Sequence, residues 1–410
     1  MHVKLSFILN SLESGGRPKG GATINGNGIP SLGAEHLDNN GGFNFKSIKY
    51  IPKEYFETLK KGIIEKENIL IVKDGATTGK VSFVSDDFPF EKSSVNEHVF
   101  LLKIDQSKAI PKYAFHYLKS PLGQRDILKD FRGATVGGIS RGFVDLVKFA
   151  LPPHIEQLQI ANQLSNADDL ISQRKQSIAL LDDFLKSTFL EMFGDPATNL
   201  KGWEAIKLGE MIEYIGDIGS NGSNETVAQN LVMSDTEGYA IMIRTVNLNK
   251  KDFIKNIKYV SKRTYDFFKK SQIFGGEIIM NKIGSAGEFW IMPKLNRPVS
   301  LGLNQLVIRL KNLNTFYLYY YLSTSYGKKN IKSRINGATT KSITKTAVKD
   351  LPLLYPPIEL QIKFSQIVEK AESLKSQYQS SLQELENLYG SLSQRAFRGE
   401  LSNINSSFFD

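Results

Sequence analysis

The sequence repeats itself at a constant distance of 204 residues. The matching positions are Gly133 and Gly337, Pro152 and Pro356, Gln157 and Gln361, and Ala167 and Ala371. A spacing kept without gaps over so long a distance indicates that one unit was duplicated, which constrains the fold more than any local pattern does. The chain should therefore contain two copies of one structural unit.

Each copy contains a long stretch in which apolar residues recur at alternating spacings of three and four. This pattern predicts a helix, and a seam kept over about four heptads is typical of a coiled coil. A Pro-Pro pair precedes each stretch, where proline suits the first turn of a helix. At about 38 residues, each helix would be roughly 57 Å long. We predict that the seams form helix–helix or partner contacts through Ile160, Leu164, Ala167, Ile171, Ile178, Leu181, Leu185, Phe364, Val368, Ala371, Tyr378, Leu382, Leu385 and Tyr389.

The rest of each copy is predicted to form strands and turns, because short runs of Ile, Val and Phe alternate with Gly and Asn. The repeat extends there, since residues 68–79 resemble 277–287 and residues 93–102 resemble 300–309. We predict an α+β fold with two mixed α/β domains, residues 1–152 and 202–356. A long helix follows each domain, within residues 153–201 and 357–410. The short link after Gly194 favours a pseudo-twofold arrangement in which the helices pair antiparallel.

Positive charge is concentrated in the two domains. Residues 1–152 contain 21 Lys and Arg against 16 Asp and Glu, and residues 202–356 contain 22 against 12. The helical segments are mildly acidic, with 4 against 7 in residues 153–201 and 5 against 7 in residues 357–410. A basic surface attracts polyanions, so the domains are candidate DNA-binding units. Ordinary solubilising lysines would also explain the excess of the first domain, but less easily that of the second.

No sequence pattern predicts catalysis by this chain. It has no cysteine, which excludes disulfides and thiolate metal sites. The stretch Gly75–Lys80 has three residues between its glycines and lacks the Ser or Thr of a phosphate-binding loop, so we predict a turn between two strands. No apolar run approaches the roughly eighteen residues of a membrane span. The N-terminus also lacks a signal-peptide core, so we expect a soluble, cytoplasmic protein.

The junctions between domain and helix are the most specific sequence features. The first runs from Arg132-Gly-Ala-Thr to Leu-Pro-Pro-His-Ile-Glu-Gln157, and the second from Asn336-Gly-Ala-Thr to Tyr-Pro-Pro-Ile-Glu-Leu-Gln361. With these junctions, and with helix ends at residues 189–194 and 394–401, the whole chain resembles the specificity subunit of type I restriction–modification systems. Leu360 is a small departure, because Glu156 holds the corresponding place in the first copy.

The resemblance implies a non-catalytic subunit whose two target-recognition domains each read one half of a bipartite site in double-stranded DNA. It also implies two methyltransferase subunits docked on the helices, and two restriction subunits in the full complex. S-adenosylmethionine, ATP and Mg²⁺ would be bound by those partners and not by this chain. Because one duplex turn is about 34 Å, helices of the expected length would leave unread base pairs between the half-sites.

DNA contacts are expected from basic, hydroxyl and amide side chains on turns. Arg and Asn can make paired hydrogen bonds to base edges, whereas Lys, Ser and Thr more often hold phosphates. The candidates are Arg17, Lys19, Thr77, Thr78, Lys80, Ser140 and Arg141 in the first domain, and Arg244, Asn247, Lys282, Ser285, Thr340, Lys341 and Lys345 in the second. The run Tyr317–Tyr321 is predicted to pack in a helix and not to stack on bases.

Two alternative functions are kept beside this one. The chain could be the DNA-recognition portion of a fused restriction–methylation enzyme, which predicts nuclease and methylase motifs that this sequence lacks. It could also be a coiled-coil adaptor that does not bind DNA, which predicts no charge difference between domains and helices.

Overall fold

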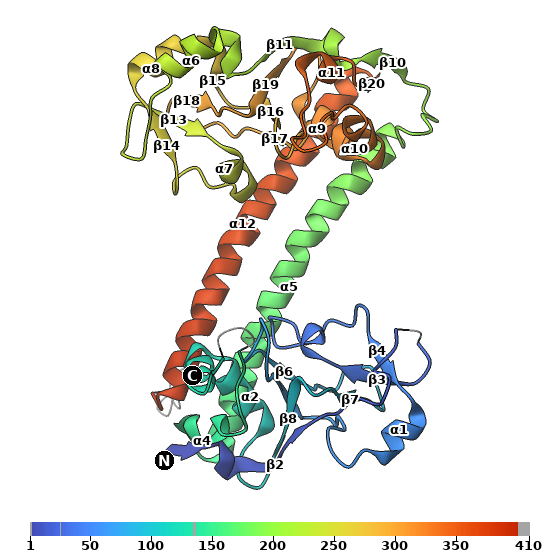
Figure 1. Ribbon diagram of the computed structural model, residues 1–410, viewed down its shortest axis with the longest axis vertical. Helices are drawn as coiled ribbons and strands as arrows, with labels where there is room; N and C mark the ends of the chain where they lie inside the picture. The colour runs from blue at the N-terminus through green and yellow to red at the C-terminus, as the bar shows by residue number, and fades with distance from the viewer. Residues whose placement is uncertain (1, 25, 134–136, 401–410) are drawn as a thin grey trace, which may run out of the picture. The chain divides into compact units, whose positions relative to one another are not determined.

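The computed structural model describes residues 2–24, 26–133 and 137–400 (Figure 1). The chain consists of two compact units. Unit 1 comprises Met1–Ser177 and Tyr378–Asp410, and unit 2 comprises Ile178–Gln377. Each unit therefore holds one domain and a segment of each long helix. Among the described residues, no helix is long and apolar enough to cross a membrane.

The elements that the two units share follow the same order, and unit 2 has additional strands and helices. Unit 1 contains strands β1 (His2–Lys4), β2 (Leu9–Ser14), β3 (Ile29–Leu32), β4 (Lys49–Ile51), β5 (Ile69–Val72), β6 (Val81–Phe83), β7 (Ser94–Val95), β8 (Val99–Ile104) and β9 (Lys148–Ala150), with helices α1 (Lys53–Thr58), α2 (Pro111–Lys119), α3 (Pro121–Leu128) and α4 (Phe143–Leu146). Unit 2 contains strands β10 (Glu204–Lys207), β11 (Ile212–Gly216), β12 (Met233–Ser234), β13 (Ala240–Ile243), β14 (Lys258–Val260), β15 (Gln272–Ile273), β16 (Ile278–Asn281), β17 (Phe289–Ile291), β18 (Val299–Leu301), β19 (Gln305–Leu310) and β20 (Pro352–Tyr355), with helices α6 (Asn224–Asn230), α7 (Thr245–Lys250), α8 (Lys262–Phe267), α9 (Thr315–Ser323), α10 (Ser325–Lys332) and α11 (Lys345–Lys349). The long helices are α5 (His154–Phe193) and α12 (Ile358–Phe397).

Both domains are built on a four-stranded antiparallel sheet. Its strand order is β2-β8-β5-β6 in unit 1 and β11-β19-β16-β17 in unit 2. The central strands β5 and β16 are buried along their whole length, because core covers both faces of the sheet. In β5, Ile69 and Ile71 face the cluster that contains the long helices, whereas Leu70 and Val72 face the second sheet. This alternation is the two-residue period of a strand.

The second sheet differs between the copies. It has the order β4-β3-β7 in unit 1 and β12-β14-β13-β18-β15 in unit 2. In both sheets the pair that joins distant parts of the chain is parallel, namely β3 with β7 and β13 with β18. In unit 1, isolated bridges from Thr23 to Tyr50 and from Ile63 to Ser94 stand where unit 2 has the strands β12 and β15.

Each domain begins and ends at one strand pair. β1 pairs antiparallel with β9, and β10 pairs antiparallel with β20. The chain therefore enters and leaves each domain at the same place, and the long helix starts only a few residues after the last strand.

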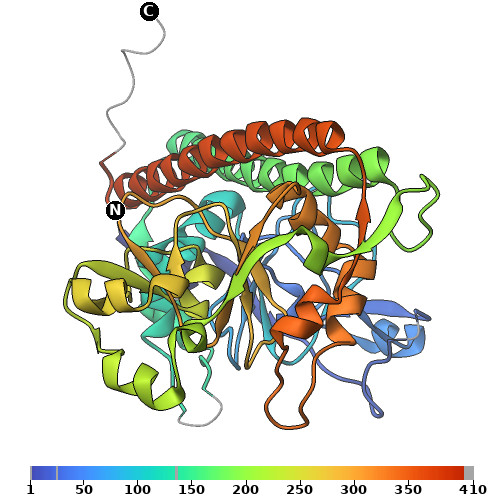
Figure 2. The same cartoon turned by 90° about the horizontal axis from the view of Figure 1, so that it is seen from above.

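In each unit a short helix, α2 or α9, packs between the sheet and the long helices (Figure 1), and a second short helix, α3 or α10, follows it directly in the chain. The arrangement is seen from above in Figure 2. A hydroxyl side chain caps the start of the second helix of each pair. The Ser120 hydroxyl accepts the backbone N–H of Gly123 (3.1 Å), and the Thr324 hydroxyl accepts that of Gly327 (3.0 Å). A β-carbon at Gly123 would lie 2.0 Å from the backbone oxygen of Tyr117, and one at Gly327 would meet the corresponding oxygen at 2.5 Å. Only glycine permits this close turn.

The two predicted long helices are confirmed, and each has 40 residues. Their predicted seams are turned inward, toward the other helix and the domain. The buried seam residues are Ile160, Leu164, Ala167, Ile171, Leu185, Phe364, Val368 and Ala371, and the half-buried ones are Ile178, Leu181, Tyr378, Leu382, Leu385 and Tyr389. The seams are therefore occupied by contacts within the chain.

In unit 1 the segments of α5 and α12 run in opposite directions. Asp168 lies beside Tyr389, and further along α5 the Arg174 guanidinium lies 4.4 Å from the ring centroid of Tyr378. His116 of α2 joins this contact, with Nδ1 3.4 Å from the Tyr389 hydroxyl. Burial lowers the pKa of His116 to about 3, so its ring is neutral at ordinary pH.

In unit 2 the helix segments are also antiparallel, but the contact is aromatic. Asp182 pairs with Lys375, and further along α5 the rings of Phe189 and Phe364 lie 5.5 Å apart. Tyr320, which takes the place of His116 in the repeat, packs 5.2 Å from the Phe364 ring. Together with the burial of Tyr317 and Tyr321, this confirms that the tyrosine run packs within the fold.

A buried glutamine joins each long helix to its domain. The Gln157 side-chain oxygen accepts the backbone N–H of Ile110 (2.8 Å), and its nitrogen donates to the carbonyl of Pro152 (2.8 Å). In unit 2 the same two bonds link Gln361 to Asn314 (2.9 Å) and Pro356 (2.8 Å). Ile110 and Asn314 directly precede α2 and α9. We call each glutamine, together with its two hydrogen bonds, a glutamine clamp.

Replacing Gln361 with Leu should destabilise unit 2. The change leaves the Asn314 N–H and the Pro356 carbonyl buried without these partners, so the free energy of unfolding should fall by about 1–3 kcal/mol. Gln366→Leu is the matched control, because Gln366 is exposed on the same helix and its loss should change stability by less than about 0.5 kcal/mol. Denaturant unfolding of the full chain compares the two variants, and equal effects would contradict the clamp.

Candidate nucleic-acid interface

Two loops that are distant in sequence are joined by backbone hydrogen bonds in each domain. In unit 1, the turn between β5 and β6 meets the loop after α3, because the Gly75 N–H donates to the Gly137 carbonyl (3.0 Å) and the Ile139 N–H to the Lys73 carbonyl (2.8 Å). In unit 2, the turn between β16 and β17 meets the loop before α11 in the same way. The Gly284 N–H donates to the Lys341 carbonyl (3.1 Å), and the Ile343 N–H donates to the Lys282 carbonyl (2.9 Å). We call these segments the paired loops.

The paired loops gather most of the predicted DNA-contacting residues. They hold Thr77, Thr78, Lys80, Ser140 and Arg141 in unit 1, and Lys282, Ser285, Thr340, Lys341 and Lys345 in unit 2. The prediction that Gly75–Lys80 forms a turn between two strands is confirmed. Residues 134–136 of the first junction lie outside the described residues.

The β5–β6 turn in unit 1 is stabilised by two of the predicted side chains. The Thr78 hydroxyl donates to the Gly75 carbonyl (2.7 Å), and Lys80 Nζ donates to the carbonyl of Leu37 (3.1 Å). Thr77 is exposed at the tip of the turn. Thr77 is therefore the best placed of the three to contact a ligand, while Thr78 and Lys80 also shape the turn.

The other loop of the pair is fixed by a buried carboxylate. The Ser140 hydroxyl donates to Asp130 (2.6 Å), whose other oxygen accepts from Arg132 (3.0 Å). The Arg141 guanidinium donates to the carbonyl of Leu12 in β2, the edge strand of the four-stranded sheet. Ser140 and Arg141 are both exposed, so they can hold the loop and still face solvent.

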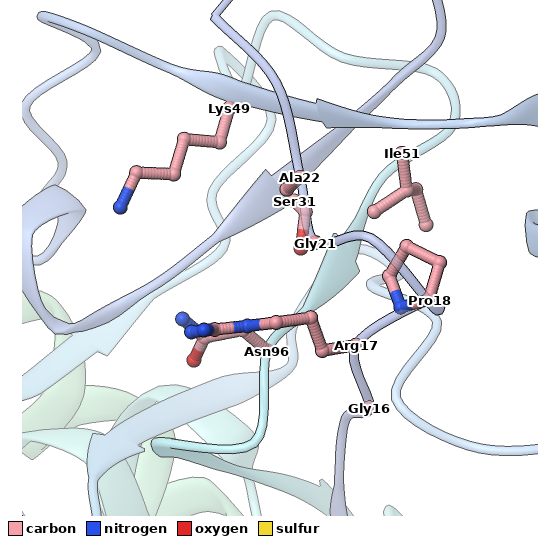
Figure 3. Close-up of a pocket in the computed structure, with 9 residues that line it drawn as sticks. All are labelled: Gly16, Arg17, Pro18, Gly21, Ala22, Ser31, Lys49, Ile51 and Asn96. Carbon is pink, nitrogen blue, oxygen red and sulfur yellow. The ribbon is translucent and has the colours of Figure 1, made fainter.

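Arg17 and Lys19 lie on a separate glycine-rich loop of unit 1. Arg17 lines a hollow of about 130 Å³ with Pro18, Ser31, Lys49, Asn96 and neighbouring residues (Figure 3). Its guanidinium is 2.9 Å from the Glu97 carboxylate. Lys19 is exposed and lies outside this hollow.

A chain of charged groups connects Arg17 with the paired loops. Glu97 is 3.4 Å from His98 Nε2, and His98 Nδ1 is 2.5 Å from Asp74 in the β5–β6 turn. No sequence pattern points to Glu97, His98 or Asp74 as site residues. Their acceptors matter because carboxylates can bond the exocyclic amino group of cytosine. Glu97 and His98 lie shortly after β7, and Asp74 lies shortly after β5. The fold thus brings Glu97 to Arg17 and links it through His98 to Asp74.

Asn247 is the buried member of the predicted set in unit 2. Its side chain is only 2% exposed and accepts the backbone N–H of Arg244 (3.2 Å) at the start of α7. The Arg244 guanidinium in turn donates to the carbonyl of Asn256 (2.6 Å). Asn247 therefore acts as a helix cap, and its burial argues against contact with a ligand. Short polar residues such as asparagine often cap helices, so the residue type alone does not separate a cap from a DNA contact.

Lys282 and Lys345 meet at a carboxylate that the sequence analysis missed. Lys282 Nζ is 2.6 Å and Lys345 Nζ is 2.7 Å from the two oxygens of Asp217, at the end of β11. Burial alone would raise the pKa of Asp217, but hydrogen bonds from both lysines and Ser220 outweigh burial and lower it to about 2. Ser285, Thr340 and Lys341 are exposed nearby on the paired loops; their contacts with DNA stay predictions.

Comparisons with known proteins agree with this arrangement. The family described as type I restriction modification DNA specificity domain matches residues 2–180 and again residues 200–387. The chain is 22% identical over 404 residues to the type I restriction enzyme StySPI specificity subunit of Salmonella potsdam, covering 91% of this chain and 82% of that protein. It is also 22% identical over 367 residues to the MjaVIII specificity subunit of Methanocaldococcus jannaschii, covering 84% and 79%.

A solved structure shares the fold. The crystal structure of the type I restriction-modification system S subunit from M. genitalium superposes with a TM-score of 0.57 at 17% identity, covering 97% of this chain and 96% of that one. The family match includes both domains and most of both long helices. The chain therefore belongs to the family of type I restriction–modification DNA specificity domains.

Proposed function

We propose that this chain is the DNA sequence-specificity subunit of a type I restriction–modification complex, and that each domain reads one half of a bipartite site. The observation that carries the proposal is the double family match, in which each copy includes one domain and most of the long helix that follows it. The two copies share the four-stranded sheet, the closing strand pair and the long helix, but their second sheets differ. This difference supports separate reading of two half-sites.

In this proposal the chain recognises DNA and performs no chemistry on it. S-adenosylmethionine, ATP and Mg²⁺ would be bound by methyltransferase and restriction subunits. The long helices would set the number of base pairs between the half-sites, since 40 helical residues extend over about 60 Å.

Methyltransferase subunits would dock on the outward faces of the long helices. The seams are occupied within the chain, but other apolar side chains are exposed. In unit 2, Leu180 and Phe184 are 58% and 50% exposed and lie one turn apart on α5. In unit 1, Leu170 and Leu388 are 51% and 50% exposed. Exposed apolar patches are typical of protein–protein contacts.

Exchanging residues 202–356 for the same domain of another family member should change one half of the methylated motif only. The boundaries suit this exchange, because β10 and β20 pair with each other inside the exchanged piece. Sequencing that detects methylated bases, with and without the gene, identifies the motif. Exchange of residues 1–152 should alter the opposite half, and a change in both halves after either exchange would contradict modular reading.

Replacing Lys341 with Gln should weaken DNA binding almost equally for all sequences. If Lys341 contacts a phosphate, the slope of log K against log salt should decrease by about 0.9. Lys294 is exposed and follows β17, away from the β16–β17 turn, so Lys294→Gln is the control. Equilibrium binding at several salt concentrations compares the variants, and identical slopes would remove Lys341 from the interface.

Replacing Leu180 and Phe184 together with Asp should prevent assembly with the methyltransferase subunit, because buried charges would replace the apolar contact. Leu200 is 89% exposed on the link before β10, so Leu200→Asp controls for an added surface charge. Copurification and sizing by light scattering measure assembly. Normal assembly of the double variant would place the docking surface elsewhere.

A further inference from the structure

Asp217 joins three separate segments of the second domain. It directly follows β11, while Lys282 starts the β16–β17 turn and Lys345 starts α11. The carboxylate is 8% exposed, whereas the Lys282 and Lys345 side chains are 27% and 35% exposed. The acid is thus inside the fold, and both ammonium groups reach toward solvent at the paired loops.

The two lysines keep hydrogen-bond donors for a ligand. Among the described residues, Lys282 Nζ donates to Asp217 (2.6 Å), and Lys345 Nζ interacts with Asp217 (2.7 Å) and donates to Ser220 (2.7 Å). Because an ammonium has three donors, two remain on Lys282 and one on Lys345. The local charge is one positive unit, since the single carboxylate compensates one of the two lysines.

The first domain has no such arrangement among its described residues. Backbone bonds identify Lys73 as the counterpart of Lys282, since each carbonyl accepts from the isoleucine of the opposite loop. Lys73 is 3.9 Å from Asp74, its neighbour in sequence. Arg141, the counterpart of Lys345 in the repeat, donates to a backbone carbonyl. Among the described residues, the shared carboxylate therefore distinguishes the paired loops of the second domain from those of the first.

We propose that Asp217 is a positioning residue that determines the specificity of the second domain. It holds Lys282 and Lys345 side by side, so that the pair fits two adjacent acceptor atoms on DNA. It also compensates one charge, so that the pair adds little attraction to DNA in the wrong register. The assignment rests on the proposed function and deepens it, because it names what sets selectivity in one half-site.

The physical consequence of losing Asp217 is twofold. Without the carboxylate the ammonium groups repel each other and lose their common position. The DNA-facing surface also gains one uncompensated positive charge, and each such charge adds about 0.9 to the slope of log K against log salt. Asp217→Asn should therefore raise affinity for unrelated DNA roughly five- to tenfold at about 0.1 M salt. Affinity for the recognised site should not rise with it, so the ratio of the two falls.

The experiment measures binding of the full chain, in its methyltransferase complex, to two duplexes at several salt concentrations. One duplex carries the site identified by methylation mapping, and the other has its second half replaced. Asp266→Asn is the matched control, because Asp266 pairs with Lys262 (2.6 Å) on exposed α8 and carries the same charge. The control should preserve the ratio, and Asp217→Glu should restore it in part.

A preserved ratio in Asp217→Asn, or equal changes in Asp217→Asn and Asp266→Asn, would overturn the assignment. Thermal unfolding verifies that each variant is folded. If Asp217→Asn does not fold, Lys345→Met decides, since it keeps the Lys282–Asp217 pair. It should lower affinity for the recognised site at least tenfold, and an unchanged affinity would equally overturn the proposal.

The same measurements separate this assignment from the proposed function. A wild-type complex that binds both duplexes equally would contradict the proposed function itself. A wild-type preference that survives the loss of Asp217 would contradict only the role of Asp217.

Discussion

The structure depends on a glutamine that is closed off from water at the start of each long helix. Gln157 and Gln361 each bind the chain just before a short domain helix and a proline carbonyl just before the long helix. A buried amide that loses its partners is costly, so each clamp permits one position of helix against domain. The strand pairs β1–β9 and β10–β20 close the domain at the same place. Helix, closing strands and short helices thus form one frame that both copies preserve.

The frame leaves the recognition surface free to vary. The two loops of each pair are joined to each other by backbone hydrogen bonds, which do not depend on side-chain identity, although side chains such as Thr78 and Ser140 also brace the individual loops of unit 1. Side chains on these loops can therefore change without loss of the loop pairing. The second sheet, with different strand numbers in the two units, shows that even whole elements can be added outside the frame. This separation explains how one duplication could produce two domains with the same frame and different outer surfaces.

The frame was predictable from the sequence, because repetition and heptad spacing report directly on backbone periodicity. The recognition surface was predictable only in outline. Loop residues such as Thr77 and Lys341 could be selected by type, since basic and hydroxyl side chains on turns suit DNA. The burial of Asn247 and the meeting of Lys282 and Lys345 at Asp217 depend on contacts between segments far apart in sequence. No periodicity records such contacts, so Asp217, Glu97 and His98 were missed.

The buried His116 gives the two halves of the molecule different responses to acid. All five histidines precede residue 155, so unit 2 contains none. The folded pKa of His116 is about 3, against about 6.5 in an unfolded chain. Between these two pH values the His116 imidazole binds a proton in the unfolded chain and stays neutral in the folded unit. On this account unit 1 loses about 1.4 kcal/mol of stability for each pH unit between about 6.5 and about 3. Mild acidification thus acts on one reader and spares the other, so the chain carries a built-in asymmetry in proton sensitivity.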